Sequence, residues 1–406
     1  MTDNRTTGVA RRRGWSRLAG NLLLATAGLV GSFLLCELLL RLLGIGYPVY
    51  VWTDAVRGVA HIPGARSLEQ HQGQSWVEIN SDGWRGPEAA LAHGDAFRIA
   101  LLGDSFIEAF EVPYEKTVGE VIERRLSALR AAPVEVLNFG HGGYGTTQEL
   151  LTLQHEVWKY SPDLILLAIT TGNDISDNYR PLKRTDFVPY HVFQGDRLVL
   201  DTSFLASADH RRRSLWTRTL LGVVQHSRLA QLVNRVRRVR RMDLQKRRNA
   251  AGDSGAEIGL GDEVHLPPAT RNWEEAWRVT EGVLRLMRDE CRSKHTPFAV
   301  VTLTRGIQVT PLREEKEKFL KRLGAKDVYY PERRLAEFGK REGVPVLNLA
   351  PSMAEQAVQR QVYFHAEKGI LGIGHWNEAG HEAAGELIAP WLAGQLTTGS
   401  TATSRR

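Results

Sequence analysis

Residues 98–105 have the sequence RIALLGDS, and this stretch decides the fold. Arg98–Leu102 is a short, almost unbroken apolar run, as expected for a strand buried on both faces of a sheet. Gly103, Asp104 and Ser105 follow at once and favour a tight turn. In open α/β sheets, ligands bind beyond the carboxyl ends of the strands, so Ser105 is the first candidate site residue.

The same pattern of a short apolar run followed by polar residues recurs along the chain. Four further strands are predicted at Val134–Phe139, Leu164–Thr170, Phe298–Leu303 and Pro345–Leu349. Segments with helical spacing of apolar residues lie between them. Strands that alternate with helices predict an α/β fold, a three-layer α/β/α sandwich around a five-stranded parallel sheet.

The composition is that of a globular protein, with 406 residues of which 42% are apolar and 24% charged. These fractions exclude a wholly disordered chain and a fibrous repeat. Two cysteines exclude a disulfide-stapled scaffold and a cysteine-based zinc cluster. A net charge of +7 is modest for this length, and we expect no nucleic-acid partner.

An uncharged run near the N-terminus, Leu18–Cys36, is long enough to cross a membrane when the leucines after it are included. We predict a transmembrane anchor over residues 18–44 after a basic cytoplasmic tail over residues 1–17. Glu37 and Arg41 interrupt its far end, but they stand one helical turn apart and can pair.

Arginines before this run place the chain after it outside the cytoplasm, so the predicted location is a bacterial inner membrane with an extracytoplasmic C-terminal domain. A cleaved signal peptide is the alternative. Its only early cleavage site, Ala25-Thr26-Ala27, leaves an apolar core that is too short, so a retained signal-anchor is favoured.

The rest of the chain divides into a juxtamembrane stalk or cap at 45–97, an α/β domain at 98–396 and a disordered tail at 397–406. A largely helical insertion at 176–271 interrupts the domain. Within it, the segment between Leu205 and Ala250 holds 13 Lys and Arg but only two acids. A basic amphipathic helix is predicted from Leu215 to Met242. The basic 211–248 segment either packs its apolar side on the body or contacts anionic lipid.

Four polar blocks stand where catalytic groups of an α/β sheet are expected. Ser105 follows the first strand, Gly143 the second and Asn173 the third, while His375 precedes the last helix. Serine is a poor nucleophile until a base such as histidine takes its proton. The backbone N–H groups of Ser105 and Gly143 and the Asn173 amide can form an oxyanion hole. This inventory indicates acyl transfer.

The four blocks resemble those of the SGNH hydrolases, the GDSL-type lipases and esterases. The matching segments are GDSF at Ser105, NFGHGG at Gly143, GND at Asn173 and GHWNEAGH at His375. The resemblance implies a flavodoxin-like fold with Ser105 as nucleophile and His375 as general base. Segment Asn80–Glu88 and the anchor are similar to membrane-anchored bacterial members.

One position departs from the family pattern. Members usually carry an aspartate three residues before the histidine, where it orients the ring, but Gly372 occupies that position. Glu367 and Asp327 are alternative orienting acids, and a Ser–His dyad held by a backbone carbonyl is also workable.

Two competing kinds of site are weaker. Gly140, Gly142 and Gly145 satisfy the GxGxxG dinucleotide pattern, but the acid about 20 residues on, Asp163, precedes its strand and so lies at the wrong edge of the sheet. His375 and His381 are six residues apart and lie on different helix faces, so they do not suggest a metal site. No cofactor and no metal are predicted.

Three functions remain open at the sequence level. The first is a membrane-anchored serine ester hydrolase that acts on a small-molecule or glycan ester through an acyl-serine intermediate. The second is an extracytoplasmic O-acyltransferase that modifies a polysaccharide, with a membrane acyl donor as partner. The third is a non-catalytic relative that binds glycan or lipid.

Overall fold

A five-stranded parallel sheet forms the centre of the computed structural model, which describes residues 6–69, 75–92, 94–250 and 261–403. Its strands are β5 (Phe97–Gly103), β6 (Val134–Gly140), β7 (Leu164–Thr170), β10 (Phe298–Leu303) and β11 (Val346–Asn348). They lie in the order β11-β10-β7-β5-β6, and every neighbouring pair is parallel. The predicted fold class is therefore confirmed, and the strand order is that of flavodoxin-like sheets.

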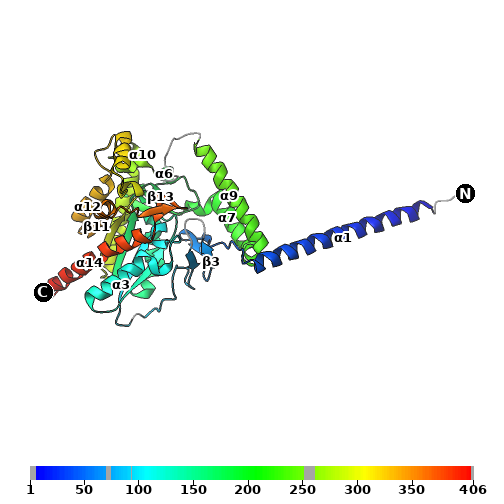
Figure 1. The fold of residues 1–406 in the computed structure, drawn as a ribbon, viewed down its shortest axis with the longest axis horizontal. Coiled ribbons are helices and arrows are strands. Elements are labelled where there is room, and N and C mark those ends of the chain that lie inside the picture. The colour runs from blue at the N-terminus through cyan, green and yellow to red at the C-terminus, as the bar shows by residue number, and fades with distance from the viewer. Residues whose placement is uncertain (1–5, 70–74, 93, 251–260, 404–406) are drawn as a thin grey trace. The chain divides into compact units, whose positions relative to one another are not determined.

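Helices cover both faces of this sheet (Figure 1). One face carries α3 (Val118–Arg130), α13 (Ala350–Arg360) and α14 (Glu378–Thr403), and the other carries α4 (Thr146–Thr152), α10 (Arg271–Ser293) and α12 (Tyr330–Glu342). Alternate residues of β5 serve the two cores, with Leu101 in the first and Leu102 in the second. All seven residues of β7 are buried, as the continuous apolar run predicts.

Strand β6 lies at an edge of the sheet, and three of its outward N–H groups are occupied by side chains. The acceptors are Ser127 Oγ for Val134, Glu123 Oε2 for Val136 and Asn138 Oδ1 for Gly140, at 2.8–3.0 Å. Occupied N–H groups leave little for another strand to pair with, so this edge is protected against strand addition.

The N-terminal region begins with the long helix α1 (Thr6–Leu42). Its stretch Ala19–Leu42, with a mean hydropathy of 2.1, is long and apolar enough to cross a membrane or to act as a signal sequence. Two hairpins follow: β1 (Val51–Asp54) with β2 (Gly58–His61), and β3 (Arg66–Glu69) with β4 (Ser75–Glu78). The segment predicted as a stalk or cap at 45–97 is thus a folded part of the body from Tyr50 onward.

The insertion differs from its prediction in two ways. It holds a hairpin, β8 (Tyr190–Gln194) with β9 (Arg197–Asp201), that the helical pattern did not indicate. Its helices are α5 (Asp174–Asp177), α6 (Arg180–Lys183), α7 (Ala208–Thr219), α8 (Leu221–His226) and α9 (Arg228–Ala250). The single helix predicted over Leu215–Met242 is wrong because the chain breaks at Leu220 and Ser227, where Ser227 has an extended backbone.

The chain forms two compact units, each with its own contacts. One joins Met1–Val49 with Arg218–Asn249, and the other joins Tyr50–Thr217 with Ala250–Arg406. The second unit also holds α2 (Ser105–Glu108), α11 (Arg313–Leu323) and the hairpin of β12 (His365–Glu367) with β13 (Ile370–Trp376). The prediction of a disordered tail at 397–406 differs from the structure, in which α14 extends to Thr403. Residues 404–406 lie outside the described residues.

Arg98 links the sheet to its surroundings from the start of β5. Its side chain is buried, and it donates to Glu135 Oε2 at 2.8 Å and to the carbonyl oxygens of Leu91 and Tyr160 at 3.0 and 2.7 Å. The buried Tyr160 carbonyl and the half-buried Glu135 carboxylate depend on this guanidinium.

We expect Arg98→Ala to lower the free energy of unfolding by about 2–3 kcal/mol, because it leaves buried acceptors without a donor. Arg124→Ala removes an exposed ion pair with Glu382 and should cost less than about 1 kcal/mol. Urea unfolding followed by tryptophan fluorescence measures both. Equal losses for the two variants would contradict the role of burial.

His191 in β8 is buried beside Thr147, with its Nδ1 3.1 Å from Thr147 Oγ1. Burial lowers the pKa of His191 to about 4. The unfolded chain binds a proton there near pH 6.5, whereas the folded chain does not. This group therefore contributes stability that is present above the unfolded pKa and is lost as the pH falls.

His191→Gln should remove that acid sensitivity. Between about pH 8 and about pH 5, the wild type should lose about 2 kcal/mol of unfolding free energy more than the variant. Urea unfolding across this range measures the difference. Parallel stability curves for the two proteins would show that His191 is protonated in the folded state as readily as in the unfolded chain.

Candidate active site

The sequence GDS places Ser105 at the first position of α2, immediately after β5. Asp104 caps this short helix, since its Oδ1 accepts the Phe106 N–H at 3.0 Å. The first N–H groups of a helix have no partner within it, so the Ser105 N–H is available to a ligand. The turn is tight: a Cβ at Gly140 would lie 2.2 Å from Glu108 N, and one at Gly103 would lie 2.4 Å from Ile107 Cγ1.

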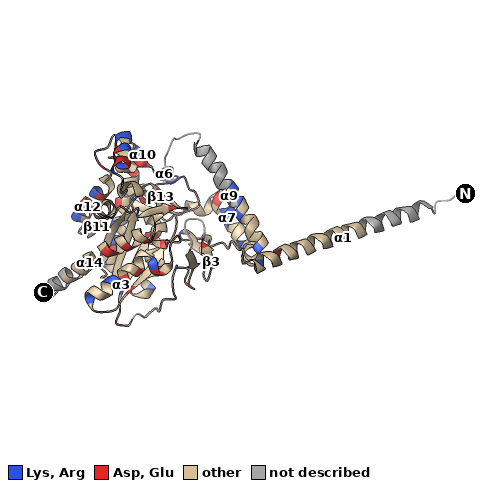
Figure 2. Cartoon of the chain, viewed as in Figure 1, with Lys and Arg blue, Asp and Glu red and all other residues tan. Residues whose placement is uncertain are grey.

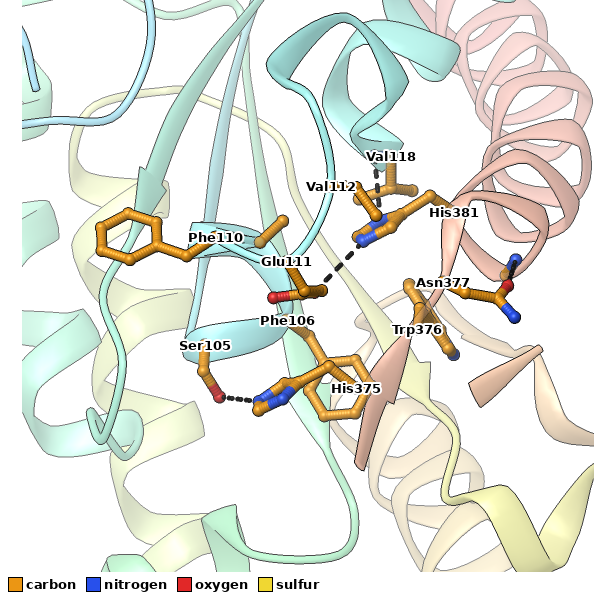
Figure 3. Close-up of polar contacts among 12 residues, drawn as sticks. Ser105, Phe106, Phe110, Glu111, Val112, Val118, His375, Trp376, Asn377 and His381 are labelled. Carbon is orange, nitrogen blue, oxygen red and sulfur yellow. Dashed lines mark hydrogen bonds and ion pairs between the residues drawn. The ribbon is translucent and has the colours of Figure 1, made fainter. Parts of the chain in front are cut away.

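His375 meets Ser105 across the end of the sheet. Its Nε2 lies 2.7 Å from Ser105 Oγ, although the two residues are 270 positions apart in the sequence. Figure 3 shows the imidazole of β13 pointing at the hydroxyl of α2, with the Phe106 ring beside it. The structure thus brings together the two side chains that the sequence predicted as nucleophile and base.

A chain of buried hydrogen bonds holds the strand that carries His375. Trp376 Nε1–H donates to Thr304 Oγ1 at 2.8 Å, and Thr304 lies 2.9 Å from His365 Nε2. His365 Nδ1 lies 2.8 Å from the Gly374 carbonyl oxygen, which can only accept. Burial lowers the pKa of His365 to about 3, so its ring is neutral. One tautomer, with Nδ1–H donating and Nε2 accepting, satisfies every bond.

Asn377 and His381, which follow His375, add further contacts that hold this segment in place. Asn377 Oδ1 accepts the Gly380 N–H at 3.0 Å and so caps α14, while its Nδ2 donates to the Tyr363 carbonyl at 2.8 Å. His381 Nδ1 accepts the Val118 N–H at 3.2 Å, and its Nε2 lies 3.5 Å from Glu111 (Figure 3). His381 therefore joins α14 to α3, and it does not contact Ser105.

No carboxylate orients the imidazole of His375 through Nδ1, the nitrogen that faces away from Ser105, among the described residues. Its Nδ1 is buried and has no hydrogen-bond partner among the described residues. Gly372, three residues before His375, has a φ of +81°, in the left-handed region that favours glycine. Asp327 instead pairs with Arg333 at 2.7 Å, and Glu367 has Lys368 as its nearest cation at 3.9 Å. Neither proposed substitute contacts the ring.

The predicted oxyanion groups come from three neighbouring strand ends. Asn173 Nδ2 donates one hydrogen to Asp104 Oδ2 at 3.1 Å, which fixes the amide orientation and leaves its second hydrogen for a ligand. Gly143 has a φ of +79° and open space around its Cα. Lys183 Nζ donates to the Gly143 carbonyl at 2.7 Å and so fixes this peptide.

Asp104 supplies a buried carboxyl below the Ser–His pair. Burial raises its pKa, but hydrogen bonds from Phe106, Asn173 and Thr170 and the positive potential of His375 oppose the rise. Glu149 and Asp174 lie further below, and burial with repulsion from Asp104 raises the pKa of both well above the usual value.

A second buried network holds the loop that carries Gly143. Glu108 Oε1 accepts the Gly142 N–H at 2.9 Å and lies 2.6 Å from His61 Nε2, while His61 Nδ1 lies 3.1 Å from the Gly83 carbonyl. Burial raises the pKa of Glu108, but the bonds from His61 and Gly142 outweigh it, so the net pKa is lowered. Through Glu108, α2 is thus bonded to the loop that carries Gly142 and Gly143.

His61, Glu108 and His141 also place three ligand atoms within 4.8 Å of one another. However, the rings of His61 and His141 stack at 4.1 Å with an interplanar angle of 24°. Lone pairs in the planes of stacked rings run almost parallel and do not converge on one ion. We therefore assign this cluster to hydrogen bonding and not to a metal.

A cavity lies elsewhere in the body. It has a volume of about 900 Å³ and runs along β6, where Trp84, Tyr114 and Glu120 are among its lining residues. Its lining does not include Ser105 or His375 among the described residues. This cavity is therefore separate from the Ser105–His375 pair.

Comparisons with known proteins give only loose matches. No protein-family model and no curated protein matches the chain. A lipase from a goat rumen metagenome has a TM-score of 0.38 at 11% identity, covering 72% of this chain and 96% of its own. An acetyl xylan esterase, AlAXEase, has a TM-score of 0.36 at 11% identity, covering 73% and 98%.

A G-D-S-L lipolytic protein from Veillonella parvula is similar at a TM-score of 0.34 and 13% identity, with 72% and 95% covered. Superpositions this loose carry no functional argument. This chain resembles SGNH hydrolases in its own sequence blocks, strand order and Ser–His contact.

The residues that support Ser105 and His375 are not indicated by the four polar blocks. His365, Thr304, Glu108 and His61 lie outside the four blocks, and their contacts join distant parts of the chain. The only signal was local: Glu108 stands three residues after Ser105, one helical turn away. Nothing in the sequence indicates that His61, in a different element, is its partner.

Thr304→Val tests the network behind His375. Valine keeps the shape but leaves Trp376 Nε1 and His365 Nε2 without a partner, so the strand of His375 loses its fixed position. We expect labelling of Ser105 by a fluorophosphonate to slow by about 10- to 100-fold, in line with the sensitivity of catalysis to small misplacements. Thr296→Val, at an exposed turn, is the control and should label at the wild-type rate; equal rates for all three proteins would contradict the network's role.

Proposed function

We propose that this protein is a serine ester hydrolase. One observation carries the proposal: the 2.7 Å contact between Ser105 Oγ and His375 Nε2 at the carboxyl end of the sheet. A serine in contact with an imidazole is the arrangement that activates a hydroxyl for attack on a carbonyl. The substrate class is a small-molecule or glycan ester.

The first half of the reaction forms an acyl-serine. His375 Nε2 takes the Ser105 proton as Oγ attacks the ester carbonyl carbon, and the carbonyl oxygen becomes an oxyanion. The N–H groups of Ser105 and Gly143 and the Asn173 amide stabilise this charge. The intermediate then collapses, the ester C–O bond breaks, and His375 gives its proton to the departing alcohol.

The second half releases the acid. His375 removes a proton from water, the hydroxide attacks the acyl carbon, and the bond to Ser105 breaks as the proton returns to Oγ. A sugar hydroxyl in place of water would give an O-acyltransferase with the same intermediate.

The geometry supports a dyad and not a triad, because Nδ1 of His375 has no acid partner among the described residues. The imidazolium that forms during the reaction therefore has no carboxylate in direct contact among the described residues. Loss of the orienting acid in a serine protease costs about 10⁴ in rate, so a slow enzyme is expected.

We further propose that α1 is a retained anchor in a bacterial inner membrane, with the body on the extracytoplasmic side. The exposed apolar stretch Ala19–Leu42 and the basic residues that precede it support this orientation. N-terminal sequencing of the protein extracted from membranes distinguishes an anchor from a cleaved signal.

Ser105→Ala and His375→Ala should each lower the kcat/KM for a short-chain aryl ester by about 10⁴-fold or more. Ser105→Ala should also abolish covalent labelling by a fluorophosphonate. The control is Ser293→Ala, which removes an exposed hydroxyl on α10. Unchanged turnover or labelling in Ser105→Ala would eliminate the proposed nucleophile.

A product analysis shows whether water or a sugar hydroxyl accepts the acyl group from Ser105. Mass spectrometry of products made with a polysaccharide present shows whether the acyl group ends as free acid or on a sugar. Glycan affinity that persists in a protein that neither labels nor turns over would identify a binding module instead of an enzyme.

A further inference from the structure

Glu37, in the last apolar turns of α1, is the N-terminal cap of a different helix. Its carboxylate accepts the N–H groups of Arg228 and Leu229 and the Ser227 hydroxyl, each at 3.0 Å. Arg228 is the first residue of α9, so these donors are the ones that a helix start leaves free. Ser227 Oγ accepts the next N–H group, that of Ala230, at 3.2 Å, so Ser227 and Glu37 together satisfy the first N–H groups of α9.

Further contacts bind the chain that leaves α1 to the same region. Arg41 Nε donates to Glu37 at 2.8 Å, as the sequence spacing suggested. Tyr47 N–H donates to Gln231 Oε1 at 2.8 Å, and the Arg235 guanidinium lies 4.2 Å from the centre of the Tyr47 ring. The start of α9 is thus held at the end of the apolar stretch, and α9 runs across the direction of α1 (Figure 1).

The outer face of α9 combines apolar and basic side chains. Val233, Val236, Arg237 and Arg240 follow helical spacing and are all exposed, with each valine 44% exposed. The segment Arg218–Asn249 holds ten Lys and Arg against one acid. Figure 2 marks basic positions along the described part of this helix. All four residues share one face, so long arginine side chains can extend toward phosphates while the shorter valines stay against the apolar layer.

We propose that α9 lies in the headgroup layer of an anionic phospholipid membrane, with Val233 and Val236 toward the acyl chains and Arg237 and Arg240 on phosphates. The proposal rests on α1 being a retained anchor. Glu37 holds the start of α9 at the depth where the apolar stretch ends. The basic excess matches the negative lipid surface, where each arginine favours the bound state by about fivefold.

The test uses the full chain in nanodiscs of phosphatidylcholine with or without phosphatidylglycerol. Cys36 and Cys291 are replaced by Ser and Ala, and Val236→Cys carries a fluorophore that a lipid-attached quencher can reach. We expect quenching in the anionic discs that falls with added salt. Arg237→Gln with Arg240→Gln should reduce the quenched-to-unquenched ratio by about 25-fold.

A matched control replaces two exposed basic residues of α11, Arg313→Gln and Lys318→Gln, and should leave quenching unchanged. Glu37→Ala keeps every arginine of α9 but removes the acceptor of the Arg228 and Leu229 N–H groups that holds the helix start at α1, and it should also reduce quenching. Circular dichroism of each labelled protein checks that the helices persist.

Anchored protein whose label is not quenched in anionic discs would overturn the lipid proposal and leave the anchor intact. Equal quenching in both kinds of disc would overturn the role of headgroup charge. If the label at position 236 is protected from the quencher only when a second copy of the chain is present, the exposed face of α9 is a dimer interface, and the lipid proposal is overturned. A mature chain that lacks α1 would overturn the anchor and this inference together.

Discussion

The close contact between α2 and the ends of two strands is the constraint on which the candidate site depends. Neither Gly103 nor Gly140 has room for a Cβ, because α2 turns directly over them. This contact puts Ser105 at the start of a helix, where its own N–H is free and its hydroxyl faces the strand of His375. A side chain at either glycine would push α2 away from the sheet and separate the pair.

Sequence patterns predicted most of the sheet and the four polar blocks, since buried parallel strands have long apolar runs and their ends are easy to locate. They failed where structure depends on contacts between distant segments. The break at Ser227 is stabilised by Glu37 of α1, which accepts the Ser227 hydroxyl and the N–H groups of Arg228 and Leu229. The β8–β9 hairpin and the support of His375 by His365 are likewise products of tertiary packing.

The candidate site replaces a charged orienting group with neutral ones. His365, Thr304 and Trp376 hold the peptide before His375, and none of them carries charge at neutral pH. The nearest carboxylate shown to be stabilised by its neighbours is that of Glu108, and it is directed at His61 and Gly142, not at His375. Such an arrangement fixes where the base stands but gives little help when it becomes an imidazolium, which is consistent with a dyad of modest rate.

The bond between Glu108 and His61 joins the α/β domain to the segment that precedes β5, so the domain depends on that segment. A soluble fragment that begins at β5 would look complete by its sequence blocks, yet it would lack the partner of the carboxylate that holds the Gly142 peptide. That carboxylate would then be left buried without its main counter-group. Any excised version of this protein should therefore start near Tyr50, where the compact body begins.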